Sequence, residues 1–342
     1  MFYFNKASTN NNPKTIMKSK VAVVMGGYSS EYEISLKSGN FICQELDQSK
    51  FDIYRAHIFK NNWYVMGEQG KKYPIDKSDF SIRMDGQKIN FDCVFNMIHG
   101  NPGENGLLQG YLETIEIPQT ASNFYASALT FNKRDCISVL KDYGILAAEN
   151  YFLHKGDPID EDAILKKVGL PCFVKANRSG SSFGISKVKT KAALKPAIQH
   201  SFDEDDEVII ESFLEGTEVD VGVIQYQGKT QALPVTEIVS ENEFFDYEAK
   251  YLGKSQEITP ARITPEQTRE VQELSIRIFN LLRLNGFARA EFIYHKGKPH
   301  FLEINTCPGM SPASIVPKQL QAAGIAYMDF FTDLVYRTLQ NS

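Results

Sequence analysis

Short apolar runs alternate with amphipathic stretches along most of the chain. Val21–Met25 and Asp92–Met97 are compact apolar runs, as expected for buried parallel strands, and a helical pattern over Ile34–Leu46 follows the first of them. Cys172–Ala176 and Glu207–Phe213 predict two more strands further along. The alternation of strands and helices predicts an α/β fold that begins with an open parallel sheet.

Interruptions of this pattern predict three domains. The first residues are polar and lack the apolar segment of a signal peptide. Pro118 and the small polar run Thr120–Ser127 mark a boundary between periodic segments. We therefore expect a disordered leader, an N-terminal substrate-binding domain, a central domain and a C-terminal catalytic domain, over residues 1–18, 19–121, 122–211 and 212–342.

The densest group of polar residues lies in a predicted hairpin near the C-terminus. Arg289 and Glu291 alternate on its first strand, so their side chains share one face, and Glu303 and Asn305 end the second strand in the same spacing. If these faces meet, three oxygen-bearing side chains converge, and such hard ligands suit Mg²⁺. A solvated face with weak ion pairs is the alternative.

Two loops follow the predicted parallel strands of the N-terminal part. Gly26–Glu31 leads into a helix, and a helix N-terminus favours anions, but Glu31 at that place points to an ammonium group instead. A carboxylate stabilised by the helix dipole is the alternative for Glu31. The second loop, His99–Gly106, is rich in glycine; His99 is either a structural hydrogen-bonding residue or part of a binding site.

Two further segments have the composition of nucleotide-binding loops. Lys175 lies on a strand that runs into Asn177–Gly184, a Ser/Gly loop able to cover phosphate groups, although most such loops are simple turns. Glu241–Gln256 is a long polar and aromatic segment, which is typical of a lid over an active site. The chain has no Walker A loop.

Composition narrows the classes of function. The net charge of −5 over 342 residues argues against nonspecific nucleic-acid binding, and no apolar run is long enough to span a bilayer. The five cysteines are scattered and form no CxxC pair, so we expect reduced thiols in a cytoplasmic protein rather than disulfides or a zinc site. These features are ordinary for a globular enzyme.

Five ordered motifs together resemble one family. They occupy Gly26–Ser35, His99–Gly110, Asn177–Gly184, Phe245–Tyr251 and Leu302–Met310. In this order they resemble the ATP-grasp superfamily and, within it, the D-alanine–D-alanine ligases, from about Val21 to Tyr336. The resemblance implies a three-domain ATP-grasp architecture, with ATP between the central and C-terminal domains.

The resemblance also implies a role for each matching residue. ATP would contact Lys133, Lys175, Ser182, Phe183, Glu211, Leu214, Glu218, Phe244 and Lys250. Two Mg²⁺ ions, which Mn²⁺ can replace, would be held by Glu291, Glu303 and Asn305. The two D-alanines would be bound by Glu31, His99, Gly309 and Ser314, and catalysis would involve Glu31, Ser181, Tyr251, Arg289 and Gly309. The implied enzyme is a homodimer that makes D-alanyl-D-alanine for the cell wall.

Some positions depart from the family pattern and leave alternatives open. Asn105 and Glu291 stand where aspartate is commoner, and the usual histidine before Ser314 is absent. A D-alanine–D-lactate or D-alanine–D-serine ligase is one alternative; Tyr251 favours the D-alanine type, because D-lactate-making relatives carry a histidine in this lid. A non-catalytic ATP-grasp binding protein is disfavoured, since every predicted metal and phosphate residue is present.

Overall fold

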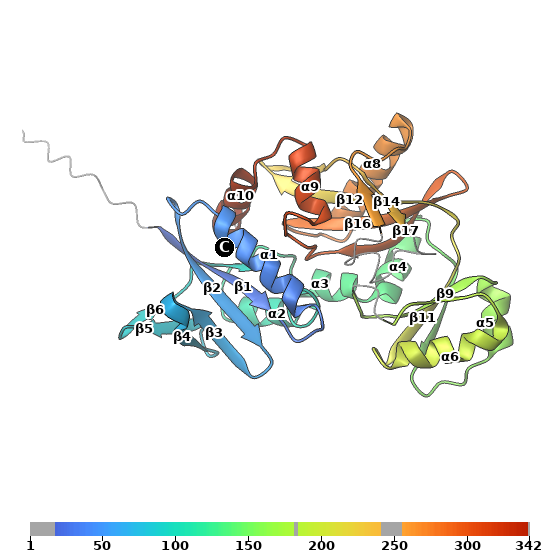
Figure 1. Cartoon of the computed structure of the whole chain (residues 1–342), viewed down its shortest axis with the longest axis horizontal. Helices are drawn as coiled ribbons and strands as arrows, with labels where there is room; N and C mark the ends of the chain where they lie inside the picture. Colours follow the sequence, from blue (N-terminus) through green and yellow to red (C-terminus); the bar gives the residue numbers. More distant parts are fainter. Residues whose placement is uncertain (1–17, 181–183, 241–254, 341–342) are drawn as a thin grey trace, which may run out of the picture.

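Three sheets and the helices around them make up the molecule (Figure 1). The structure is a computed structural model that describes residues 18–180, 184–240 and 255–340. The seven-stranded N-terminal sheet, the four-stranded central sheet and the six-stranded C-terminal sheet follow one another along the chain. This arrangement confirms the expected α/β class.

The N-terminal sheet is parallel only where it carries the predicted loops. Its order is β6-β5-β4-β3-β2-β1-β7, and β1 pairs in parallel with β2 and β7, whereas β2 to β6 form an antiparallel meander. The meander extends the parallel sheet expected from the sequence. The strands are β1 Ser19–Gly26, β2 Phe51–Phe59, β3 Asn62–Met66, β4 Lys72–Asp76, β5 Ser81–Met84, β6 Gln87–Ile89 and β7 Cys93–Asn96.

Helices α1 (Tyr32–Glu45) and α2 (Leu107–Thr114) follow β1 and β7 and begin close to the carboxyl ends of these strands. Both loops therefore open at one edge of the sheet, which is where α/β sheets bind ligands. Gly26 and Gly27 adopt φ angles of 104° and 105°, a region that residues with a Cβ rarely enter. Their conformation lets the chain turn directly from β1 into the Glu31 loop.

The central sheet is antiparallel in the order β10-β9-β11-β8. Two helices cover one face of it, with Val174, Leu194 and Ile210 in their shared core. Its loop Asn177–Gly184 joins β9 to β10, as the sequence predicts. The elements are β8 Asn150–His154, α5 Glu161–Val168, β9 Cys172–Ala176, β10 Ser186–Val188, α6 Lys191–Phe202 and β11 Glu207–Ser212.

The C-terminal sheet has the order β15-β14-β12-β16-β17, and β13 also pairs with β12. Pro234 separates β13 from β14, because proline cannot donate to a strand ladder. The elements are β12 Gly216–Tyr226, β13 Lys229–Ala232, β14 Thr236–Ser240, β15 Ser255–Ile258, α8 Pro265–Leu281, β16 Phe287–His295, β17 Lys298–Asn305, α9 Ile315–Ala322 and α10 Tyr327–Gln340.

Packing does not follow the order of the chain. Helices α3 (Phe124–Phe131) and α4 (Lys133–Asp142) share a hydrophobic core with the C-terminal sheet, including Ile137, Val221 and Phe292. Helix α10 packs against α1 and β7 of the N-terminal sheet. The domain limits at 122, 211 and 212 therefore stay a prediction, because these cores cross them.

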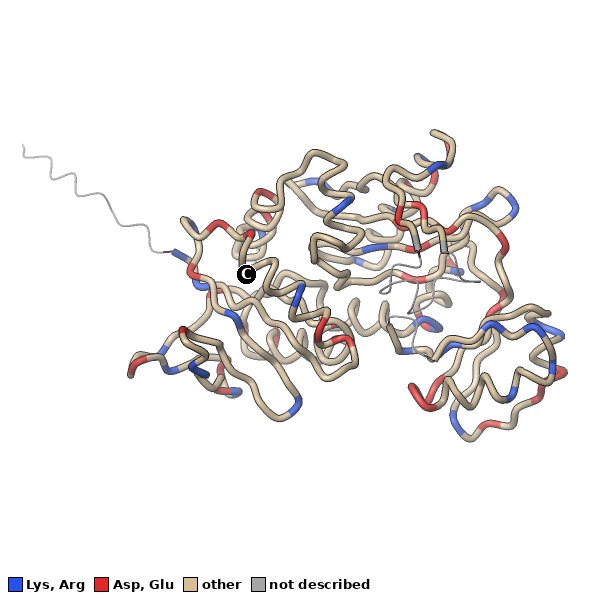
Figure 2. Tube along the Cα trace, viewed as in Figure 1, with Lys and Arg blue, Asp and Glu red and all other residues tan. Residues whose placement is uncertain are grey.

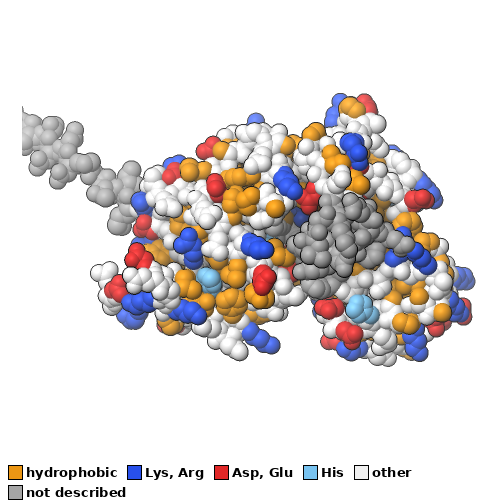
Figure 3. Space-filling view, in the orientation of Figure 1, with side chains coloured by type: hydrophobic (Ala, Val, Ile, Leu, Met, Phe, Trp, Pro, Cys, Tyr) orange, Lys and Arg blue, Asp and Glu red, His pale blue; other side chains and the backbone are white. Residues whose placement is uncertain are grey.

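Acidic and basic residues are interspersed along all three parts of the trace (Figure 2). The described atoms on the face in Figure 3 show the same mixture, with small hydrophobic groups between the charges. Within the described ranges, no helix has the length and apolarity needed to cross a bilayer.

Candidate active site

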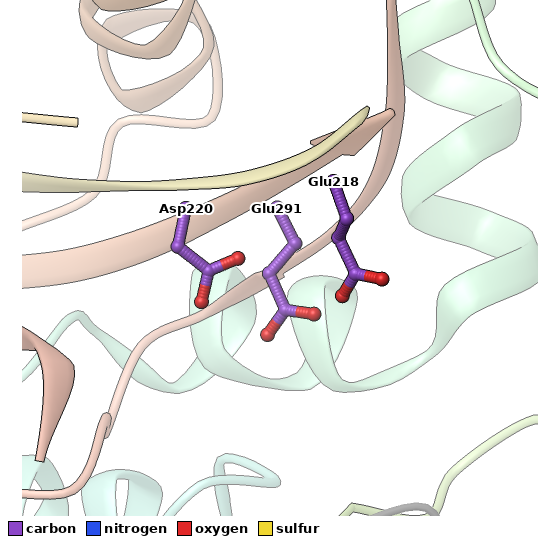
Figure 4. Close-up of side chains that lie close together, drawn as sticks. All are labelled: Glu218, Asp220 and Glu291. Atoms are coloured by element: carbon purple, nitrogen blue, oxygen red, sulfur yellow. The ribbon is translucent and has the colours of Figure 1, made fainter. Parts of the chain in front are cut away.

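Three carboxylates from neighbouring strands form a row on one face of the C-terminal sheet. Asp220 of β12 pairs with Glu291 of β16, and Glu291 pairs with Glu303 of β17. We call these residues the carboxylate row. Residues in register on adjacent strands place their side chains side by side, so the hairpin brings its two polar faces together, as the sequence predicts. Figure 4 shows Asp220, Glu291 and the neighbouring Glu218 directed to the same side of the sheet.

Arg289 lies two residues before Glu291 on β16 and forms ion pairs with two carboxylates of the row. Its Nε lies 3.1 Å from Asp220 Oδ2, and its guanidinium donates to Glu291 Oε1. Burial lowers the pKa of Arg289, but the carboxylates of Glu291 and Asp220 outweigh burial, so the pKa is raised. Asn305 is the residue opposite Arg289 on β17. One guanidinium and four oxygen-bearing side chains therefore converge.

Two lysines bring positive charge to the site from other elements. Lys133, the first residue of α4, lies 3.1 Å from Glu303 Oε2 and donates to the Ser179 carbonyl at 2.7 Å. Lys175 of β9 lies 2.6 Å from Glu211 Oε2. Burial lowers the pKa of Lys175, but Glu211 and Glu303 outweigh it and the pKa is raised. Lys175 therefore stays charged.

Glu31, His99 and Glu104 form a second group, which we call the amine end. Glu31 lies against Gly180, because a Cβ added to Gly180 would be 2.7 Å from Glu31 Oε2. Glu104 is buried and accepts a hydrogen bond from the Gly100 N–H at 2.9 Å. Burial, and then the charge of Glu31, raise the pKa of Glu104 to about 8. A buried carboxyl group whose pKa is raised further by a second carboxylate indicates concentrated negative charge, which favours a cationic ligand.

The turn after β17 closes the site on the side of α9. Gly309 lies next to Ser314, since a Cβ at 309 would be 2.9 Å from Ser314 Oγ. Ser314 Oγ accepts a hydrogen bond from the Ser311 N–H at 3.2 Å and precedes the first turn of α9. The unsatisfied amides of a helix N-terminus favour a carboxylate.

Members of each of these groups line one cavity of ≈ 370 Å³. Its lining includes predicted residues from all parts of the site: Glu31, His99, Lys133, Arg289, Glu303, Asn305, Gly309 and Ser314. A cavity with an acidic end, a guanidinium and a helix N-terminus can bind small zwitterions and hold them beside a phosphate donor.

The chain matches two family models that together cover most of it. They are the D-ala D-ala ligase N-terminus, over residues 20–122, and the D-ala D-ala ligase C-terminus, over residues 139–336. The D-alanine--D-alanine ligase of Christiangramia forsetii is 59% identical over 323 residues, which are 94% of this chain and 99% of that protein. The chain belongs to the D-alanine–D-alanine ligase family.

Solved structures of family members have the same fold. The VanG D-Ala:D-Ser ligase of Enterococcus faecalis is 30% identical, with a TM-score of 0.82, and the match covers 94% of this chain and 100% of that one. The D-alanine--D-alanine ligase of Bacillus anthracis, complexed with ATP, is 28% identical, with a TM-score of 0.76 and coverage of 94% and 98%. The expected ATP-grasp fold is confirmed, and ligases with different second substrates share it.

The donor set fits the magnesium expected in this family. Glu218, Asp220 and Glu291 offer oxygen atoms that all lie within 4.8 Å of one another, and Glu303 is in register beside Glu291. Lys133 and Arg289 lie against these carboxylates, which marks a place where positive charge is stabilised. Carboxylate and amide oxygens at such a place are the ligands that Mg²⁺ prefers.

The structure does not test several predicted contacts of the nucleotide. Glu211 pairs with Lys175, and Leu214 is buried just after β11, so the proposed adenine and ribose contacts of Glu211, Leu214 and Glu218 stay predictions. The expected homodimer is also untested. Six predicted residues of the Ser/Gly loop and the lid segment lie outside the described ranges: Ser181, Ser182, Phe183, Phe244, Lys250 and Tyr251.

Sequence reasoning missed two residues of the site. Asp220 is 1% exposed and contacts Arg289, and its position two residues after Glu218 on a predicted strand is the signal that could have found it. Glu104 stands inside the predicted His99 loop, but only the folded chain shows that its carboxyl group is buried in the cavity wall.

Proposed function

We propose that the chain joins two D-alanines into D-alanyl-D-alanine and converts ATP to ADP and phosphate. The observation that carries the proposal is the convergence, in one cavity, of an acidic amine end, a guanidinium beside a carboxylate row, and a helix N-terminus. Family membership and the ATP complex of a relative support the choice of substrates.

Activation of the first D-alanine comes first. Its ammonium group is bound by Glu31, which leaves its carboxylate directed toward the carboxylate row and the γ-phosphoryl group of ATP. The carboxylate oxygen attacks the γ-phosphorus, ADP leaves, and D-alanyl phosphate forms. Lys133 and Lys175 stabilise the transferred negative charge. Magnesium held by Glu291, Glu303 and Asn305 would neutralise the phosphate oxygens.

Peptide-bond formation follows. The second D-alanine places its carboxylate at the N-terminus of α9 beside Ser314, and its neutral amine attacks the acyl carbon. Arg289 and the Gly309 N–H stabilise the oxyanion of the tetrahedral intermediate. Collapse of the intermediate breaks the bond between the acyl carbon and the phosphate oxygen; phosphate leaves and the amine loses its proton.

The test is the release of phosphate from ATP with Mg²⁺ in the presence of D-alanine, L-alanine, D-alanine plus D-lactate, D-alanine plus D-serine, or no amino acid. The product of each reaction is identified by mass. We expect D-alanyl-D-alanine and no product from L-alanine. A preferred D-alanyl-D-lactate or D-alanyl-D-serine product would move the proposal to the alternative suggested by the D-serine ligase neighbour.

A further inference from the structure

Two buried residues outside the carboxylate row form a continuous hydrogen-bonded path. Ser38 on α1 is fully buried, and its Oγ lies 3.1 Å from Nε2 of His99. His99 Nδ1 lies 2.6 Å from the carbonyl oxygen of Cys307. The Ser38 hydroxyl also accepts a hydrogen bond from the Met310 N–H at 3.0 Å. The path therefore starts and ends in the turn after β17.

The partners determine the direction of each bond. A carbonyl oxygen only accepts, so His99 carries its proton on Nδ1 and donates it to Cys307. In the neutral ring, Nε2 then accepts the proton of Ser38 Oγ. Burial lowers the pKa of His99 and Arg289 lowers it further, against the opposing charge of Glu31, so the ring stays neutral. Both ring nitrogens are occupied, and His99 is not free to take a proton from the substrate amine.

The hydrogen bonds of this path anchor both ends of the Cys307–Met310 turn. The Cys307 carbonyl and the Met310 N–H enclose only Pro308 and Gly309, so fixing these two groups fixes the peptide plane between them. Gly309 carries the N–H that the proposed function assigns to the oxyanion. The two anchors come from far away in the chain, since Cys307 and Met310 are 208 and 272 residues from their partners.

We propose that Ser38 and His99 are positioning residues that orient the Gly309 N–H toward the tetrahedral intermediate of peptide-bond formation. The proposal rests on the proposed function. The oxyanion exists only after the amine attacks the acyl phosphate, so the pair acts on the second chemical step. A displaced oxyanion donor lowers turnover without changing the affinity for the substrates.

Ser38→Ala tests this, with Ser35→Ala as a matched control. Ser35 stands one turn earlier on α1, is equally buried, and also makes two buried hydrogen bonds, from the Gly26 N–H at 2.8 Å and to the Met97 carbonyl at 2.7 Å. Neither partner of Ser35 belongs to the turn after β17. We expect Ser38→Ala to lower kcat about 10- to 100-fold with little change in either KM for D-alanine, and Ser35→Ala to lower stability alone.

The two chemical steps are measured separately. Positional isotope exchange in ¹⁸O-labelled ATP reports formation of D-alanyl phosphate, and the mass of the dipeptide reports the second step. In Ser38→Ala the isotope exchange should persist while dipeptide formation slows. Equal slowing of both steps, or equal loss in Ser38→Ala and Ser35→Ala, would overturn the proposal.

His99→Asn is the second variant, because an asparagine amide can reach the place of Nδ1 and donate to the Cys307 carbonyl but cannot reach Ser38. We expect it to keep part of kcat, and to show no further loss when combined with Ser38→Ala, since both changes break one path. If the kcat losses of the two single variants added fully in the double variant, Ser38 and His99 would not act through one path. In ¹⁵N-labelled wild-type protein, the His99 ring should carry its proton on Nδ1; a protonated Nε2 would also overturn it.

These outcomes separate the two proposals. If the wild-type chain makes no dipeptide with D-alanine, the proposed function fails. If it makes the dipeptide and Ser38→Ala retains wild-type kcat in a folded protein, only the positioning role fails. Thermal unfolding of each variant, compared with wild type, establishes that it is folded.

Discussion

The carboxylate row and the amine end hold acidic groups in opposite ways. The row is built by register on three adjacent strands, and all three of its carboxylates lie against Arg289 or Lys133. The amine end gathers residues from separate loops, and the bond to the Glu104 carboxylate comes from the Gly100 N–H. The pKa of Glu104 rises to about 8 because burial and the charge of Glu31 outweigh the Gly100 N–H and the charge of Lys133.

The difference shows how one cavity can bind two kinds of ligand, phosphate with metal at the carboxylate row and an ammonium group at the amine end. A row already neutralised by protein cations can exchange those contacts for phosphate and metal without burying an unpaired charge. The amine end, where the charge of Glu31 raises the pKa of Glu104, is stabilised by the ammonium group of the substrate. Four substitutions follow, ordered from the largest expected effect to the smallest.

Glu303→Gln breaks the row most directly. It removes the carboxylate that lies 3.1 Å from Lys133 and that would ligate magnesium. We expect kcat to fall about 100-fold or more, because such charge stabilisation is worth several kcal/mol. Steady-state ADP formation measures the loss. Glu270→Gln, which removes a more exposed carboxylate from a weaker pair with Lys298, is the control and should keep full activity.

Arg289→Lys keeps the positive charge beside the row but loses the fork that reaches both Asp220 and Glu291. We expect turnover to fall roughly 10- to 100-fold, with the affinity for ATP changed less than about threefold, since the oxyanion forms late. Binding of ATP by calorimetry and turnover are compared. An equal loss in both would mean that Arg289 acts on the nucleotide rather than on the oxyanion.

Glu31→Gln tests the amine end through substrate binding. It removes the negative charge expected to bind the ammonium group of the first D-alanine, so KM for that site should rise about 10-fold. KM for ATP should stay near its wild-type value. Glu33→Gln, an exposed change on the first turn of the same helix, is the control. If KM for D-alanine in Glu31→Gln equals that of wild type, Glu31 does not bind the ammonium group of the first D-alanine.

Glu104→Gln should change the pH dependence of stability. Between the unfolded pKa near 4.3 and the folded pKa of about 8, the native state retains a proton that the unfolded state has released, so stability falls as pH rises. Glutamine does not titrate and can still accept the Gly100 bond. From pH 5 to pH 8 the variant should lose less unfolding free energy than wild type, by on the order of 3 kcal/mol.

Denaturant unfolding at both pH values measures this difference. Glu113→Gln is the control, because the Glu113 carboxylate also accepts a backbone N–H, from Phe124, but is exposed. Its pH dependence should match that of wild type. Parallel pH curves for wild type and Glu104→Gln would show that Glu104 is ionised in the folded protein.

Much of the fold and part of the site could be predicted because they depend on local periodicity. The alternation of Arg289 with Glu291, and of Glu303 with Asn305, is enough to predict a shared face once a hairpin forms. The short strands β4 to β6 and helix α9 were not predicted, because periodicity over so few residues does not distinguish an element from a loop. Asp220 was missed because an acidic residue on a strand usually faces solvent.

The sequence by itself determined the family, the order of the elements and the chemistry available at each loop, because motifs and periodicity are properties of contiguous residues. Tertiary structure decided which distant groups meet. Only folding brings α4 to β17, so that Lys133 reaches Glu303, and only folding joins Ser38, His99 and the Cys307–Met310 turn. The reason is physical: these pairings join residues 61 to 272 positions apart, so they depend on how sheets and helices pack, and packing is not encoded in any local pattern.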